Sequence, residues 1–115
     1  MKPILFFGEG EYVSVDPQNL ICVKADALYT KVFIKNTEAS GKPFIKHTAT
    51  VNVGGFAKKL PASKFCRVSR SVVVNMDSVK SIRDGAVQLH TDVEEPILIG
   101  KTYRQQFLKR FNRIQ

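Results

Sequence analysis

Hydrophobic and polar residues alternate with a period of two along most of the chain, a pattern typical of β-strands that bury one face. In the first half this alternation predicts strands at residues 4–7, 11–15, 20–25, 29–35 and 44–50. In the second half it predicts strands at residues 64–68, 71–75, 79–83, 86–91 and 96–99. Asp84-Gly85, between two of these runs, is typical of a hairpin turn. We therefore expect a mainly β protein.

Two segments predict helices. Phe56 and Leu60 are four residues apart and Pro61 ends the run, which indicates one or two helical turns. Near the C-terminus, Thr102 and Gln105 have the spacing of a capping box, which predicts that a helix begins there. An apolar stripe at spacings of four, four and three follows, and we expect it to pack on the core. Its members are Tyr103, Phe107, Phe111 and Ile114.

The chain of 115 residues has no internal repeat, low-complexity tract or linker, so we expect one domain over residues 1–115. The polar residues 37–43 are expected to form a hairpin loop. The apolar stretch at residues 3–7 is too short for a signal peptide or a membrane span, which favours a soluble, cytoplasmic protein.

The sequence offers little for metal binding or catalysis. Cys22 and Cys66 lack CxxC spacing and have apolar neighbours, which favours buried thiols, although a single disulfide stays open. His47 and His90 have no partner at ligand spacing, so we expect no metal and no cofactor. No compact Ser/His/Asp, Cys/His or paired-carboxylate set is present, and we expect no enzyme activity.

Charge points to a polyanionic partner. The formal net charge is +8 and the sequence pI about 9.7. Residues 1–56 carry six lysines against five acids, whereas residues 57–115 carry twelve lysines and arginines against five acids. The basic surface is therefore expected in the second half of the chain.

Residues 65–76, FCRVSRSVVVNM, concentrate the candidate chemistry of that half. The β-branched run at residues 72–74 favours a strand, while Arg67 and Arg70 bring two guanidinium groups close to its start. Two hydroxyls, from Ser69 and Ser71, lie beside them. Arginine forks on a rigid strand suit phosphates and guanine edges, so the segment indicates nucleic-acid recognition.

Residues 59–75 resemble the LytTR family of bacterial DNA-binding domains, whose signature is a short helix ending in Leu-Pro, then Phe-x-Arg-x-His-Arg-Ser, apolar residues and Asn. Residues 21–29 and 96–103 are similar to flanking parts of the family pattern, and the resemblance covers roughly residues 4–112. Three departures stand out: Ser69 replaces the motif's His, Gly100-Lys101 replaces Ser-Arg, and Lys24 replaces a usual Glu.

The resemblance implies small antiparallel sheets stacked in an elongated β domain, with one short helix and a C-terminal helix. It implies that loops enter successive major grooves of duplex DNA at paired direct repeats, often as dimers, and that a receiver or sensor partner lies outside this chain. The corresponding loops here are residues 28–31, 69–70 and 100–104. Within and beside them, the expected DNA-binding residues are Thr30, Lys31, Arg67, Ser69, Arg70, Lys101 and Arg104.

The individual residues differ in how strongly they indicate DNA contact. Arg70 is the strongest candidate, whereas phosphate contact and simple solvation are equally open for Arg67. Asn75 favours turn capping over DNA contact, because Asn bonds well to its local backbone. Lys101 and Arg104 flank a predicted helix N-terminus, which suits phosphate. Tyr29 is expected to pack.

The main hypothesis is a sequence-specific DNA-binding regulator of bacterial transcription. One alternative is a basic module for RNA or single strands, which would need aromatic side chains exposed among the lysines. Another is a membrane-surface or protein-interaction module that acts through the C-terminal amphipathic helix.

Overall fold

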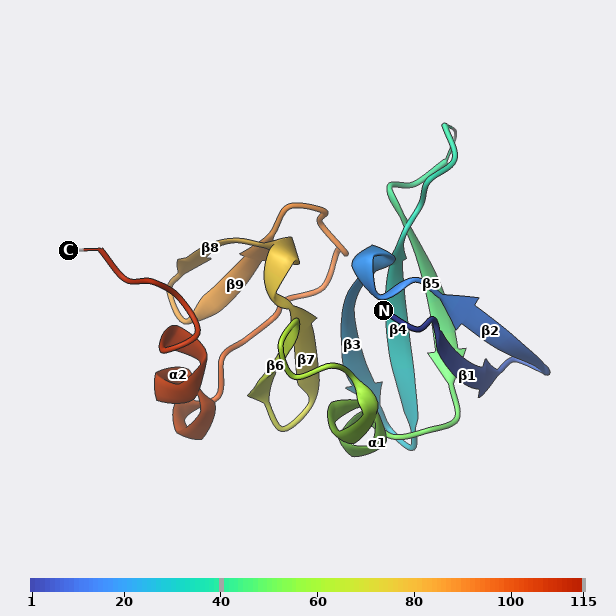
Figure 1. The fold of residues 1–115 in the computed structure, drawn as a ribbon, viewed down its shortest axis with the longest axis horizontal. Helices are drawn as coiled ribbons and strands as arrows, with labels where there is room; N and C mark the ends of the chain where they lie inside the picture. The colour runs from blue at the N-terminus through green and yellow to red at the C-terminus, as the bar shows by residue number, and fades with distance from the viewer. Residues whose placement is uncertain (40, 115) are drawn as a thin grey trace.

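The computed structural model describes residues 1–39 and 41–114. Short β-strands dominate, and two α-helices and two 3-10 turns lie between or after them (Figure 1). In chain order the elements are β1 (Ile4–Gly8), β2 (Glu11–Val15), a 3-10 turn (Pro17–Asn19), β3 (Leu20–Asp26), β4 (Tyr29–Lys35), β5 (Phe44–Ala49), α1 (Val53–Lys59), β6 (Phe65–Ser69), β7 (Val72–Asn75), a second 3-10 turn (Met76–Ser78), β8 (Val79–Arg83), β9 (Ala86–Leu89) and α2 (Lys101–Leu108).

A five-stranded antiparallel sheet forms the centre, with the strand order β5-β4-β3-β7-β6. The hairpins β1–β2 and β8–β9 form two further sheets. Asp84 and Gly85 both have positive φ, 54° and 73°, which confirms the hairpin turn between β8 and β9. Where β1 passes β5, a Cβ on Gly8 would overlap the carbonyl oxygen of Thr48, so this crossing requires glycine.

Side chains alternate across the central sheet and divide the core into two clusters. Cys22 and Val74 point to the face that β8–β9 and α2 cover, whereas Val23 and Val73 point to the face covered by α1 and β1–β2. The stacked layers extend over 46 × 31 × 27 Å (Figure 1). The predicted stack of small antiparallel sheets in an elongated β domain is confirmed.

Most strand predictions agree with the structure to within two residues, but the strand predicted at residues 96–99 is wrong. That segment makes one isolated bridge, between Leu98 and Ala86, and its Leu98 side chain is 61% exposed. Hydrogen bonds to Val87 and Gly85 hold it beside β9, and Pro96 has no N–H with which to extend a ladder.

The C-terminal helix is shorter than predicted. It begins at Lys101 with Gly100 as its N-cap, so the predicted capping box at Thr102 is wrong. It ends at Leu108, beyond which the Arg110 guanidinium donates to the carbonyl of Phe65. The predicted apolar stripe is therefore only partly in the core: Phe107 is buried, but Ile114 is 90% exposed.

Several smaller expectations can also be compared with the structure. Cys22 and Cys66 are buried free thiols, as expected, and burial raises the pKa of Cys22 to about 12. The 37–43 loop is closed at its base by a hydrogen bond from the Asn36 amide to Pro43, while Ser40 lies outside the described residues. No helix in the described part of the chain is long and apolar enough to cross a membrane.

Candidate nucleic-acid interface

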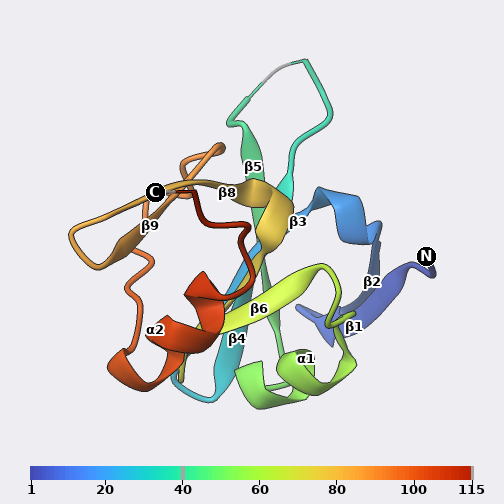
Figure 2. The same ribbon diagram turned by 60° about the vertical axis from the view of Figure 1, so that its left-hand side comes forward.

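The three segments expected at the interface converge on one side of the molecule. The β3–β4 turn and the β6–β7 turn lie side by side, because the amide of Ala25 donates to the carbonyl of Ser71 at 2.8 Å. The start of α2 joins them through a hydrogen bond of 2.8 Å from the Gly100 amide to the Val68 carbonyl. In Figures 1 and 2, α2 and the β3–β4 turn lie along the same lower side of the molecule.

The Arg67 side chain stabilises the β6–β7 turn by hydrogen bonds to its backbone. Its Nε donates to the Ser69 carbonyl at 3.2 Å, and its Nη2 donates to the Arg70 carbonyl at 2.6 Å. The guanidinium carbon also lies 6.0 Å from the centre of the Tyr103 ring on α2. Arg67 therefore links the turn to the helix, and part of its fork is already occupied.

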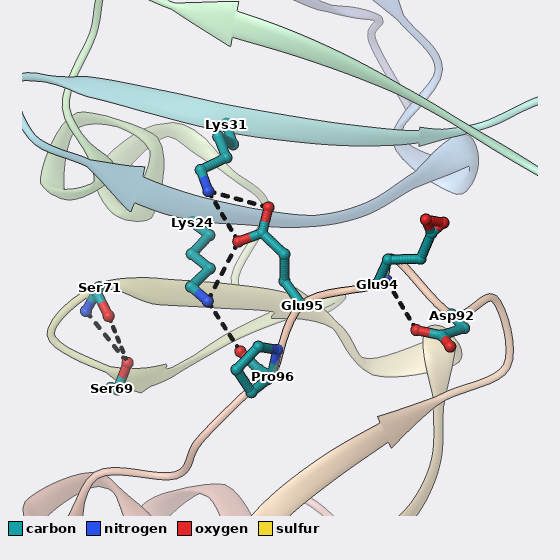
Figure 3. Close-up of polar contacts among 8 residues, drawn as sticks. All are labelled: Lys24, Lys31, Ser69, Ser71, Asp92, Glu94, Glu95 and Pro96. Atoms are coloured by element: carbon teal, nitrogen blue, oxygen red, sulfur yellow. Dashed lines mark hydrogen bonds and ion pairs between the residues drawn. The ribbon is translucent and has the colours of Figure 1, made fainter.

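The serine hydroxyls complete this turn. The amide of Ser71 donates to Ser69 Oγ at 3.2 Å, and the two hydroxyl oxygens are 3.3 Å apart (Figure 3). Such local bonds from a serine side chain fix the turn backbone. Ser69 is half-buried.

Arg70 has a different environment from Arg67. It lies at the tip of the turn and is exposed, and within the described residues its guanidinium makes no hydrogen bond or ion pair. Its backbone is held by Arg67 while its fork stays available. This combination of a fixed backbone and a free guanidinium suits recognition of a phosphate or of a guanine edge.

The start of α2 supplies two more exposed cations. Lys101 is the first helical residue and Arg104 follows within the first turn. Gly100, the N-cap, has no side chain, so no side-chain hydrogen bond caps the first amides of the helix, and free helix-start amides suit an anion. A Cβ on Gly100 would lie 3.4 Å from Ser69 Cα, so glycine permits the close approach of helix and turn.

Two of the expected residues are not free at this surface. Thr30 is fully buried and its hydroxyl donates to the Val51 carbonyl at 2.7 Å, so its side chain does not reach the surface in this structure. Lys31 is half-buried, and its ammonium donates to both carboxylate oxygens of Glu95, at 2.8 and 3.0 Å.

Other residues depart from or confirm the expectations. Tyr29, expected to pack, is 50% exposed, and Leu28 beside it at the turn is 82% exposed. Asn75 is buried and accepts from the Asp77 amide at 3.0 Å, which confirms its capping role. Its amide nitrogen also donates to the Leu20 carbonyl, so it ties β7 to the start of β3.

Sequence reasoning did not include Lys24 in the site. This residue lies opposite Lys31 in the β3–β4 register and lines a hollow of about 210 Å³ together with Ser69, Ser71 and Gly100. The signal was present, because Lys24 replaces the Glu that is usual in the LytTR pattern. Its location beside the β6–β7 turn follows from the pairing of β3 with β7, which the sequence does not specify.

Taken together, the fold and the site define a class: a small β domain that brings two turns and a helix start together, with exposed cations on the β6–β7 turn and at the helix start. The LytTr DNA-binding domain profile matches residues 10–112. The chain therefore belongs to the LytTr DNA-binding domain family. No curated protein sequence shows significant similarity to the chain.

A solved structure agrees with this assignment at the level of the fold. It is the LytTr DNA-binding domain of a protein described as a methyl-accepting/DNA response regulator from Bacillus cereus. The two chains are 21% identical with a TM-score of 0.71, and the match covers 98% of this chain and 99% of the other.

Proposed function

We propose that this domain binds double-stranded DNA sequence-specifically and regulates bacterial transcription from the cytoplasm, by binding rather than by catalysis. In this proposal the β3–β4 turn, the β6–β7 turn and the start of α2 enter the major groove. Family membership supports DNA binding and transcription regulation, and the convergence of the three segments supports their acting together.

The observation that carries the proposal is the contrast between Arg67 and Arg70. Arg67 uses its fork to fix the β6–β7 turn, and this leaves the exposed Arg70 fork at a defined position. Arg70 is assigned base or phosphate contact, and Lys101 and Arg104 are assigned phosphate contact. Ser69 is assigned a hydrogen bond to the DNA beside Arg70. Lys31 is assigned a phosphate contact, which requires that its ammonium first be released from Glu95.

The alternatives receive less support from the structure. Phe107 of α2 is buried against the core, so the helix face that carries it is not available to a membrane or a second protein, although Phe111 and Ile114 beyond the helix are exposed. A single-strand binder would stack bases on exposed aromatics among its cations. Of the exposed aromatics Phe7, Tyr12, Tyr29 and Phe111, Tyr29 is the one that lies in the three converging segments.

The partners follow from the same proposal. Duplex DNA with paired direct repeats is the expected ligand, with a homodimer forming on the DNA and a receiver or sensor module acting from outside this chain. Contacts between copies on direct repeats are head-to-tail, since a translation along the DNA relates the two sites.

Selection of duplexes from a random-sequence pool, repeated at two salt concentrations, tests the proposal. We expect one enriched sequence and an affinity that falls steeply with salt. Failure of any sequence to become enriched would contradict specific recognition. If single-stranded RNA outcompetes the duplex, the RNA-binding alternative gains support.

The Arg70→Ala variant then tests the assignment of the site. We expect it to lose about 1–3 kcal/mol of discrimination between the selected duplex and a scrambled one. Lys35→Ala is the matched control, because Lys35 is also an exposed cation but lies at the end of β4 farthest from the β3–β4 turn. Equal effects of the two variants would rule out a special role for Arg70.

A further inference from the structure

Lys24 and Lys31 face each other across the β3–β4 ladder, and one carboxylate lies between them. Glu95 Oε1 is 3.3 Å from Lys24 Nζ and 2.8 Å from Lys31 Nζ (Figure 3). Two like charges directly opposite each other on a sheet repel. Glu95, which comes from the segment between β9 and α2, offsets that repulsion.

This cluster keeps capacity for a further anion. It contains two cations and one carboxylate, so it retains one positive charge. Lys24 donates one further hydrogen bond, to the Pro96 carbonyl at 3.0 Å, so within the described residues each ammonium still has a donor to offer. The three side chains are 20–21% exposed, so solvent and solutes reach them.

The cluster borders the proposed interface. Lys24 pairs with Val72, the residue that follows the β6–β7 turn, and Figure 3 shows its side chain extending toward Pro96 beside the turn that carries Ser69 and Ser71. Lys24 and the two serines line the same hollow. A phosphate that approaches Ser69 on the DNA backbone would therefore meet the Lys24 ammonium.

Glu95 can leave the lysines without movement of the backbone. Val93 and Ile97 on either side of it are buried and anchor the segment. The carboxylate is carried on a flexible side chain between these anchors, so a change of rotamer suffices to release it. Hydrogen bonds from Lys31 and Lys24 outweigh the effect of burial and hold the pKa of Glu95 below its ordinary value, so the occupant is an anion.

We propose that Lys24 and Lys31 form an additional phosphate-binding site of the DNA interface, and that Glu95 occupies this site as an internal competitor in the free domain. The inference rests on the proposed function and adds to it a determinant of affinity. Carboxylate and phosphate oxygens accept the same charge-assisted hydrogen bonds from an ammonium. Binding of DNA exchanges one acceptor for the other, so Glu95 weakens binding.

The Glu95→Gln variant tests the competition, with a random-sequence duplex as the probe because phosphate contacts do not depend on sequence. We expect it to bind about 3- to 10-fold more tightly than the parent. Glu94→Gln is the matched control: it removes the same charge one residue away, from a carboxylate that faces away from the cluster and pairs with the exposed Lys42 (Figure 3). If folded Glu95→Gln binds no more tightly than Glu94→Gln, the inference is overturned.

A second measurement tests whether Lys24 and Lys31 bind phosphate, and it does not depend on a folded Glu95 variant. In Lys24→Gln and in Lys31→Gln, the slope of log K against log salt concentration should become less steep by about 0.9, the value of one phosphate contact. Lys35→Gln, at the other end of β4, should leave the slope unchanged. Unchanged slopes in both cluster variants would overturn the inference, because a purely structural role does not alter the number of phosphate contacts.

The failures of the two proposals can be told apart. If the parent chain does not bind duplex DNA, the proposed function is overturned and the Glu95 inference with it. If the parent binds duplex DNA and the cluster variants behave like their controls, the Glu95 inference alone is overturned.

Discussion

Arg67 and Arg70 lie three residues apart in one motif, yet their side chains have opposite surroundings. The Arg67 guanidinium bonds to two carbonyl oxygens of the turn and lies against Tyr103, whereas the Arg70 guanidinium points into solvent. Arg67 thus positions the turn, and the free Arg70 fork is the one that we propose contacts the ligand. This difference can be measured separately for each residue.

Arg67→Lys separates positioning from simple charge. Lysine keeps the positive charge but cannot donate to the Ser69 and Arg70 carbonyls in the same forked geometry. We expect DNA affinity to fall nearly as far as in Arg70→Ala, with a loss of about 1 kcal/mol in the free energy of unfolding. Fluorescence anisotropy with the selected duplex and urea unfolding measure the two effects. Retention of parental affinity would mean that Arg67 acts only as a charge.

Asn75→Ala tests the capping role at the same scale. The Asn75 side chain is buried, and it bonds to the Asp77 amide and to the carbonyls of Leu20 and Pro17. Removing it leaves buried groups unpaired, which we expect to cost about 2–3 kcal/mol of unfolding free energy. Asn112→Ala, at an exposed position, should change stability by less than about 0.5 kcal/mol. Thermal unfolding compares the two, and equal losses would contradict the capping role.

The alternation of hydrophobic and polar residues predicts which side chains are buried only on strands that have one buried face. Thr30 was expected at the surface, but β4 is in the middle of a sheet with layers on both faces, and Thr30, Val32 and Phe33 are all buried. Alternation cannot distinguish inside from outside on such a strand. The partner of Lys31 was equally hidden, since Glu95 is 64 residues away in the chain.

At the scale of elements, α2 shows what periodicity can and cannot predict. The spacing of Phe107, Phe111 and Ile114 continues the helical pattern, but the helix ends at Leu108. Phe111 still contacts the Phe107 ring, with ring centroids 5.3 Å apart. Beyond Leu108 the chain continues as a turn, and the Arg110 guanidinium bonds there to the Phe65 carbonyl. A contact with a strand 45 residues earlier is not visible in a local pattern.

Phe107→Ala and Ile114→Ala form a matched test of this shorter helix. Phe107 is fully buried between α2 and the central sheet, so its truncation should cost about 3–5 kcal/mol. Ile114 is 90% exposed, so its truncation should change the unfolding free energy by less than about 0.5 kcal/mol. Urea unfolding of both variants measures the difference. A large loss in Ile114→Ala would show that the helical stripe does continue to residue 114.

At the scale of the whole molecule, the sequence predicted the kind of partner and the basic half of the chain, but not how the surface is assembled. The proposed interface combines residues near 28 and 70 because β3 pairs with β7, a pairing between strands that are not consecutive in sequence. Residues near 101 join them through the hydrogen bond from the Gly100 amide to the Val68 carbonyl. The resemblance to the LytTR family supplied this convergence, which strand propensity alone does not contain. The amino-acid composition predicts that the surface is positively charged, but not which residues form it.

The Lys24–Lys31–Glu95 cluster ties the central sheet to the segment before α2, so stability of the whole fold should depend on its ionisation. Hydrogen bonds from the lysines lower the pKa of Glu95 below its ordinary value of 4.5, despite the opposing effect of burial. The same contact with Glu95 raises the pKa of Lys31 above 10.5. Stabilisation by Glu95 is therefore present above pH 4.5 and is lost as the pH falls through the lowered pKa. Stabilisation by Lys31 is present below pH 10.5 and is lost as the pH rises through the raised pKa.

We predict that the difference in unfolding free energy between the parent and Glu95→Gln is constant from about pH 6 to pH 9 and shrinks below about pH 4. Urea unfolding at pH 7, 4 and 3 measures this difference, and Glu94→Gln shows how much of it any exposed carboxylate contributes. Because other acids titrate equally in the parent and the variant, the subtraction isolates the cluster. A difference that stays the same down to pH 3 would show that the Glu95 carboxylate does not hold the two layers together as an anion. The DNA-binding effect of Glu95→Gln would then need an explanation other than competition for the lysines.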